Sequence, residues 1–109
     1  MCSPEHLEEL RAICAGAEPM SDGPLLLVYL PKLVVTVDGV GHELDGLLCL
    51  SQHQGYMTRL YLSKPFPNKR QNWTVTQLVG RQWHCWSWQG VPASHRPAEV
   101  LAQHMTALR

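Results

Sequence analysis

The chain has 109 residues, of which 45% are hydrophobic and 17% charged. These proportions fit one small domain over residues 1–109 and leave no room for a second core. Nine Lys and Arg residues balance nine Asp and Glu residues, which disfavours nucleic acid or an anionic membrane as the partner. No apolar stretch approaches the roughly 20 residues of a membrane helix, and residues 1–6 lack the features of a signal peptide. We therefore expect a cytoplasmic protein.

Two amphipathic helices are expected, one at each end of the chain. The first is predicted over residues 4–15, where Leu7, Leu10 and Cys14 recur at helical spacing. A turn-rich joint follows at 18–24. The last helix is predicted over 97–108, because Pro97 suits a first helical turn. Its apolar face consists of Val100, Leu101, His104, Met105 and Leu108. On that face His104 is expected to be a hydrogen-bonded core residue rather than a catalytic one.

Four antiparallel strands are predicted between residues 25 and 64. Runs rich in β-branched and large apolar residues cover 25–30, 33–37, 43–51 and 58–64. A turn or a sheet edge is predicted at Pro31-Lys32, and a reversal at Asp38-Gly39-Val40-Gly41. The short links favour antiparallel neighbours, because parallel strands need a crossover of a dozen or more residues. The expected fold is therefore α+β, a four-stranded antiparallel meander with an N-terminal helix and a C-terminal helix.

The segment 65–96 is predicted to be a long irregular loop, since its first part is polar, basic and broken by prolines. All four tryptophans follow, at Trp73, Trp83, Trp86 and Trp88. Tryptophans bury a large area and keep an N–H for a polar partner. Without a positive groove they are not expected to stack nucleic acid bases. The last three are expected to anchor the loop on the sheet or, with Arg81, to form a binding surface for a partner protein.

The cysteines are widely spaced, at Cys2, Cys14, Cys49 and Cys85, and form no C-x-x-C pair. Neither a zinc ribbon nor a thioredoxin-type motif is therefore present, and free thiols are expected. Adjacent His84 and Cys85 would point to opposite faces of a strand, and no ligand pair recurs at the usual spacing. We expect no metal site and no cofactor.

Cys85 is the candidate nucleophile, because an accessible loop with His84 and Arg81 nearby would favour its thiolate. The alternative is that Cys85 is a small residue buried among the tryptophans, as free cysteines commonly are. Cys49 lies in an apolar run and is expected to be a core residue.

The run from Gly80 to Trp88, followed by Arg96-Pro97 and the closing helix, resembles the small prokaryotic E2-like proteins. These are relatives of ubiquitin-conjugating enzymes that are encoded with ubiquitin-like proteins, E1-like enzymes and JAB-type peptidases. The shared pattern is Gly-Arg, spaced aromatics, Trp-Ser, Arg-Pro and an amphipathic helix. Residues 4–64 match by the order of elements. The resemblance implies a UBC-like fold with an active-site loop at 65–96.

The resemblance also implies that Cys85 accepts the C-terminus of a ubiquitin-like protein from an E1-like adenylating enzyme, as a thioester, and transfers it to an amine. Asn68 or Asn72 would stabilise the oxyanion, and His84 would assist proton transfer. Two rival hypotheses are a non-catalytic E2-like adaptor, which binds proteins through the tryptophan loop and the sheet edge, and an unrelated α+β binding domain. An exposed Cys85 thiol facing Asn68 or Asn72 would support transfer, and a thiol packed under Trp83 would support the adaptor.

Overall fold

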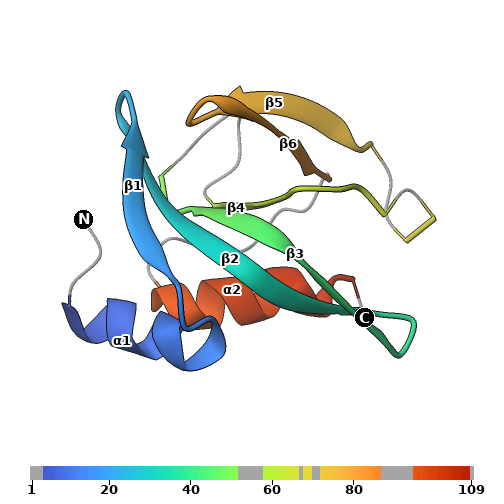
Figure 1. Ribbon diagram of the computed structural model, residues 1–109, viewed down its shortest axis with the longest axis horizontal. Coiled ribbons are helices and arrows are strands. Elements are labelled where there is room, and N and C mark those ends of the chain that lie inside the picture. The colour runs from blue at the N-terminus through green and yellow to red at the C-terminus, as the bar shows by residue number, and fades with distance from the viewer. Residues whose placement is uncertain (1–3, 52–57, 67, 70–71, 87–94, 109) are drawn as a thin grey trace.

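The computed structural model describes residues 4–51, 58–66, 68–69, 72–86 and 95–108. Within these ranges the chain forms two helices and six strands. They follow in the order α1 (Pro4–Ile13), β1 (Glu18–Asp22), β2 (Leu25–Val37), β3 (Val40–Cys49), β4 (Arg59–Leu62), β5 (Thr74–Leu78), β6 (Arg81–Cys85) and α2 (Pro97–Thr106). Both helices lie side by side under one face of the sheet (Figure 1). The α+β class and the two terminal helices are thus confirmed.

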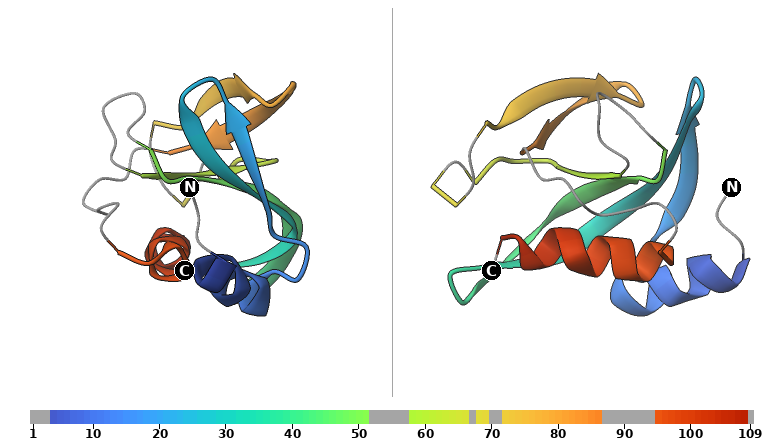
Figure 2. Two further views of the ribbon diagram at one scale, coloured as in Figure 1. Left: turned by 90° about the vertical axis from the view of Figure 1, so that its left-hand side faces the viewer. Right: turned by 180° about the vertical axis from the view of Figure 1, so that it is seen from behind.

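The strands form one antiparallel sheet in the order β1-β2-β3-β4-β6-β5. The sheet is strongly curled, and the β5–β6 hairpin folds over the face that points away from the helices (Figure 2). At one corner the two sheet edges meet, because the backbone N–H of Val79 donates to Asp22 Oδ2 at 2.9 Å. The sheet therefore has a helix-covered face and a concave face that its own hairpin covers.

The predicted four-stranded meander needs correction at the first of its turns. Residues 25–37 form the single strand β2, with a register shift between Leu30 and Leu33. Lys32 has a φ of 56°, and its N–H donates to Asp45 Oδ1 at 3.2 Å. Pro31 and Lys32 together oppose the single residue Asp45 of β3, so β2 contains one extra residue. This extra residue switches the inward-facing positions from even to odd numbers, so that Leu30 and Leu33 both face the helices. Pro31-Lys32 is thus a bulge within a strand and not a turn.

Two further strands lie in the segment predicted to be an irregular loop. Within residues 65–96 the chain forms the β5–β6 hairpin, whose turn consists of Val79 and Gly80 with φ values of 44° and 80°. Two consecutive positive φ values are typical of the tight turns that match strand twist. The expected turn-rich joint at 18–24 is also largely a strand, β1, which pairs with β2 and turns only at Gly23-Pro24. The other expected reversal, at 38–41, is confirmed, with its turn at Asp38-Gly39 and residues 40–41 already in β3.

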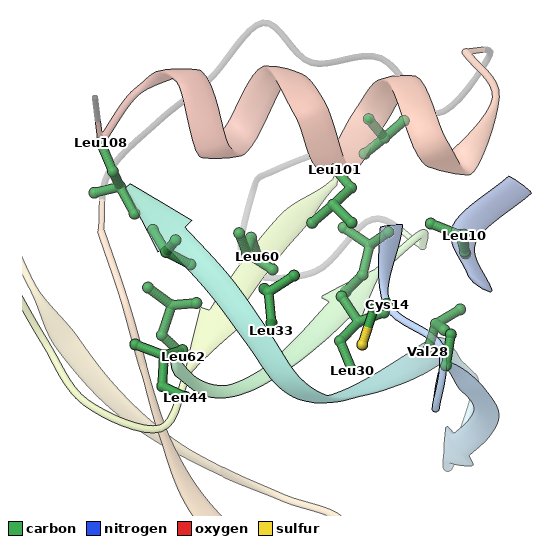
Figure 3. Packing of buried hydrophobic residues seen from close by; sticks show 14 of the residues in the cluster. Leu10, Cys14, Val28, Leu30, Leu33, Leu44, Leu60, Leu62, Leu101 and Leu108 are labelled. Carbon is green, nitrogen blue, oxygen red and sulfur yellow. The ribbon is translucent and has the colours of Figure 1, made fainter. Parts of the chain in front are cut away.

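The larger core lies between the helices and the sheet (Figure 3). Leu10 of α1 and Leu101 of α2 are fully buried against strand leucines such as Leu33 and Leu60. Gly46 of β3 leaves room for this packing, because a Cβ atom there would lie 2.9 Å from Leu33 Cδ2. No helix in the described ranges is long and apolar enough to cross a membrane.

A smaller core fills the concave face, beneath the β5–β6 hairpin. Its fully or nearly fully buried residues are Leu25, Leu27, Leu47, Cys49, Tyr61, Leu78, Trp83 and Cys85. Trp83, the bulkiest of them, has no exposed surface. This second core contains the candidate nucleophile, so the curl of the sheet decides the environment of that thiol.

Candidate functional site

Cys85 lies on the concave side of β6 and is 1% exposed. The antiparallel register that pairs Leu62 with His84 places the buried Tyr61 beside Cys85 on the neighbouring strand. In the described part of the chain, the polar contact of its Sγ is Thr74 Oγ1 at 3.3 Å, across the hairpin. The sulfur therefore packs inside the core and is not presented to a substrate.

The other described cysteines are buried as well, Cys14 with 4% and Cys49 with 0% of its surface exposed. Cys14 Sγ contacts the carbonyl oxygen of Pro31 at 3.0 Å, and Cys49 Sγ contacts that of Ser51 at 3.2 Å. Burial raises the pKa of both thiols, since a thiolate is poorly solvated there. Cys2 lies outside the described residues. The expectation that Cys49 is a core residue is confirmed.

The structure does not assemble the predicted catalytic set around Cys85. His84 is half-buried on the opposite face of β6, because neighbouring strand residues alternate between faces. Asn68 and Asn72 are both exposed in the connection between β4 and β5. Asn68 lines a separate pocket of about 240 Å³ together with Phe66 and Lys69. Within the described ranges, neither a base nor an amide donor from the predicted set is placed at the sulfur.

Trp83 holds the hairpin down on the concave face. Its Nε1–H donates to the carbonyl oxygen of Leu78 at 3.1 Å, within the same hairpin. The ring meets Tyr29 of β2 edge-on at 6.2 Å, and the Arg81 guanidinium lies 4.5 Å from its centroid. An indole with these contacts anchors β6, so the anchoring role expected for this residue fits its environment.

Trp86 belongs to the other core and is 3% exposed. It lies in a row of aromatic rings, 5.2 Å from Trp73 and 6.3 Å from the His104 imidazole. Phe66 extends this row beyond Trp73, with their centroids 6.4 Å apart. Trp83 and Trp86 thus fasten the end of β6 to both faces of the sheet. Trp88, the third predicted binding residue of this group, lies outside the described residues.

A buried polar pair lies at the end of this row. Thr58 Oγ1 and His104 Nε2 share a hydrogen bond of 2.9 Å. Burial, and next the nearby positive charge of Arg59, lower the pKa of His104 to about 4, so the imidazole is neutral at pH 7. The apolar helical stripe correctly marked His104 as a core residue. Its partner Thr58 lies directly before β4, 46 residues away in the sequence, and no sequence pattern marked it.

Asp45 connects three strands at the end of the concave face where Arg81 lies. It accepts a hydrogen bond from the Lys32 backbone and one from Arg81 Nη1, both at 3.2 Å. Burial acts to raise the pKa of the Asp45 carboxyl, but these donors outweigh burial and the pKa falls below its usual value. Arg81, predicted to bind a partner, therefore already holds β6 to β3.

Replacing Asp45 by asparagine is expected to lower the free energy of unfolding by about 1 kcal/mol at pH 7, because the charge-assisted bond to Arg81 is lost. Asp38→Asn is the matched control. Asp38 pairs with Lys69 at 2.6 Å on the surface, and its loss is expected to cost less than about 0.5 kcal/mol. Urea unfolding of both variants checks this, and equal losses would contradict the role of Asp45. Since the folded pKa is depressed, the Asp45 contribution should disappear as the pH falls through that pKa.

The described residues contain no group of three His, Cys, Asp or Glu side chains placed to hold a metal ion. Comparison of the chain with protein-family models, curated proteins and solved structures found no match. The E2-like resemblance therefore rests on the sequence pattern alone.

Proposed function

We propose that this chain is a non-catalytic E2-like module that binds proteins of a ubiquitin-like conjugation system, either the E1-like adenylating enzyme or the ubiquitin-like protein. The burial of the Cys85 thiol, at 1% exposed surface, carries this proposal. Thioester exchange requires a thiolate that both an incoming protein C-terminus and an acceptor amine can approach. A sulfur enclosed in a hydrophobic core does not offer that approach.

The surroundings of Cys85 support binding over transfer in a second way. Exposing the sulfur would require lifting the β5–β6 hairpin, and with it the fully buried Trp83, out of the concave core. Loss of one such aromatic side chain from a core costs several kcal/mol. His84 on the opposite face would still be out of reach as a base. The hairpin is therefore a fixed part of the core, and a partner protein would bind to the solvent-exposed surface of the domain.

Thiol labelling of the native protein tests this proposal. Treated with iodoacetamide and analysed by mass spectrometry, Cys14, Cys49 and Cys85 are expected to stay unlabelled until denaturant is added. Incubation with ATP, an E1-like enzyme and a ubiquitin-like protein is expected to give a non-covalent complex, seen by size-exclusion chromatography, and no reductant-sensitive adduct. The complex should form equally well with Cys85→Ala and with the matched core variant Cys49→Ala. Rapid labelling of Cys85, and an adduct that only Cys85→Ala abolishes, would instead establish the transferase.

A further inference from the structure

All three aspartates of the chain are followed directly by glycine, as Asp22-Gly23, Asp38-Gly39 and Asp45-Gly46. At such a step the glycine nitrogen can attack the aspartyl side chain and close a five-membered imide, since glycine has no Cβ to hinder its approach. The three steps share this local chemistry but not their surroundings. The first lies at the β1–β2 turn, the second at the β2–β3 turn and the third inside β3. The fold therefore decides which of them can react.

The Asp45-Gly46 step is fixed within the sheet. The Asp45 carboxylate accepts hydrogen bonds from the Lys32 backbone and from Arg81 Nη1. Gly46 is buried and pairs with the strands on both sides of β3. Closing a ring at this step would break both bonds of the carboxylate and distort the centre of the sheet. The tertiary structure therefore protects it.

The Asp22-Gly23 step is held by one long-range contact. Asp22 is half-buried, and its Oδ2 accepts the backbone N–H of Val79 at 2.9 Å. Turning this carboxyl toward the Gly23 nitrogen would break the bond that joins the two sheet edges. It would also take the acceptor away from a partly buried N–H, which is costly. This step is therefore protected as well.

The Asp38-Gly39 step lies at the exposed tip of the β2–β3 hairpin (Figure 1). Val37 pairs with Val40 across this two-residue turn, so the ladder bonds belong to the flanking pair and not to the turn residues. The Asp38 side chain is 76% exposed, and a Cβ atom at Gly39 would meet nothing within 4 Å. Among the described residues, the Asp38 carboxylate contacts the Lys69 ammonium at 2.6 Å, a surface pair that costs little to break. The carboxyl can therefore reach the Gly39 nitrogen.

We propose that Asp38-Gly39 is a self-modification site, at which the folded protein converts Asp38 to isoaspartate. The Gly39 nitrogen attacks the carbon of the Asp38 side-chain carboxyl in its acid form. A C–N bond forms, the C–OH bond breaks, and the hydroxyl leaves as water with the proton of the Gly39 N–H. A second water then opens the imide at the main-chain carbonyl, so that the chain runs on through the former side chain. One water leaves and one enters, and the sum is an isomerisation.

The product would change the surface next to this turn. Isoaspartate adds one atom to the backbone of a two-residue turn and moves the carboxylate away from its original position. Asp38 and Lys69 line one pocket of about 240 Å³ together with Phe66 and Asn68. Loss of the Asp38–Lys69 pair would release the connection between β4 and β5 from the β2–β3 turn and reshape this pocket. The modification does not depend on the proposed function.

The test is to incubate the parent protein in water enriched in heavy oxygen, because each opening of the imide adds one oxygen atom from water. Digestion in ordinary water with trypsin and a glutamyl endopeptidase separates the three steps into the peptides 19–32, 33–43 and 44–59. Peptide 33–43 is expected to gain the label at least about tenfold faster than the other two, since each of those must first break additional hydrogen bonds. An isoaspartyl methyltransferase should methylate the same peptide.

Two controls separate the fold from the local sequence. In denaturant the three peptides are expected to gain label at comparable rates. Asp38→Glu keeps the charge that faces Lys69 but would have to close a larger ring, so it should abolish the label in 33–43. A lead of 33–43 that persists in denaturant, equal labelling in the folded protein, or label that survives Asp38→Glu would each overturn the proposal.

Asparagine variants give a faster readout of the same ring closure, because the asparagine side chain loses ammonia and the peptide changes mass. Asp38→Asn is expected to lose ammonia at least about tenfold faster than the matched variants Asp22→Asn and Asp45→Asn in the folded state. Circular dichroism checks that all three are folded. Equal rates for the three folded variants, or a slower rate for Asp38→Asn, would show that the hairpin tip is not the reactive site.

Discussion

Replacing Trp83 by alanine is expected to lower the free energy of unfolding by about 3–5 kcal/mol, the range found for large aromatic residues removed from cores. Trp83 is fully buried and joins the hairpin to β2 through Tyr29 and to the Leu78 carbonyl through its indole N–H. Its removal leaves a cavity in the smaller of the two cores, where few neighbours are available to fill it. Urea unfolding monitored by circular dichroism measures the loss.

Trp83→Phe is the matched control, because it keeps an aromatic ring and removes the N–H donated to Leu78. It is expected to cost about 1–3 kcal/mol, less than alanine. Trp83→Ala should also make Cys85 and Cys49 react with iodoacetamide without denaturant, since all three share the concave core. Cys14, which lies in the helix-side core, should stay protected. A loss below about 1 kcal/mol for Trp83→Ala would show that the hairpin is not held by this residue.

Acidification from pH 7 to pH 4 is expected to destabilise the protein by about 3 kcal/mol through His104 alone. Its pKa is about 4 in the folded chain and about 6.5 when unfolded. The unfolded chain therefore takes up a proton in this interval while the folded chain does not. The stabilisation is complete above pH 6.5 and is lost as the pH falls towards 4. Each unit of pKa difference corresponds to about 1.4 kcal/mol.

His104→Gln tests the origin of this pH dependence. Glutamine retains a hydrogen-bonding group for Thr58 but does not titrate. The variant should be less stable at pH 7, and its stability should vary between pH 6.5 and 4.5 much less than that of the parent. His95→Gln is the control, because His95 is exposed and faces Glu99 at 3.4 Å. A parent slope that persists in His104→Gln would place the titrating group elsewhere.

Local sequence patterns predicted the elements that have clear start signals or a strong period in their apolar residues. Both helices occur where the apolar spacing and the prolines at their first turns indicated, although each ends two residues earlier than predicted. Strands β3 and β4 also follow their apolar runs. The sequence did not predict the bulge at Lys32, because a proline followed by a lysine between two apolar runs is as typical of a turn as of a bulge. Its conformation depends on the Asp45 carboxylate, thirteen residues away in sequence.

The missed strands are those at or next to the edges of the sheet. Strand β1 is polar and includes a proline, and β5 and β6 mix threonine, glutamine and aromatic residues. These segments have no continuous apolar run, so only their pairing with neighbours makes them strands. The same pairing brings Val79 to Asp22 across 57 residues and curls the sheet.

The sequence by itself determined the α+β class, the antiparallel strand order of the central strands and the cluster of tryptophans next to Cys85. These follow from periodicity, short connections and composition, which act over a few residues. Only the tertiary structure decided whether that thiol faces solvent. The curl of the sheet buries Cys85 in one cluster with Trp83 and Tyr61. Asn68 and Asn72, in contrast, are exposed. The physical reason is that the exposure of a strand residue depends on which distant segments cover its face of the sheet. Alternation along the strand shows which residues share a face, but not which of the two faces becomes covered.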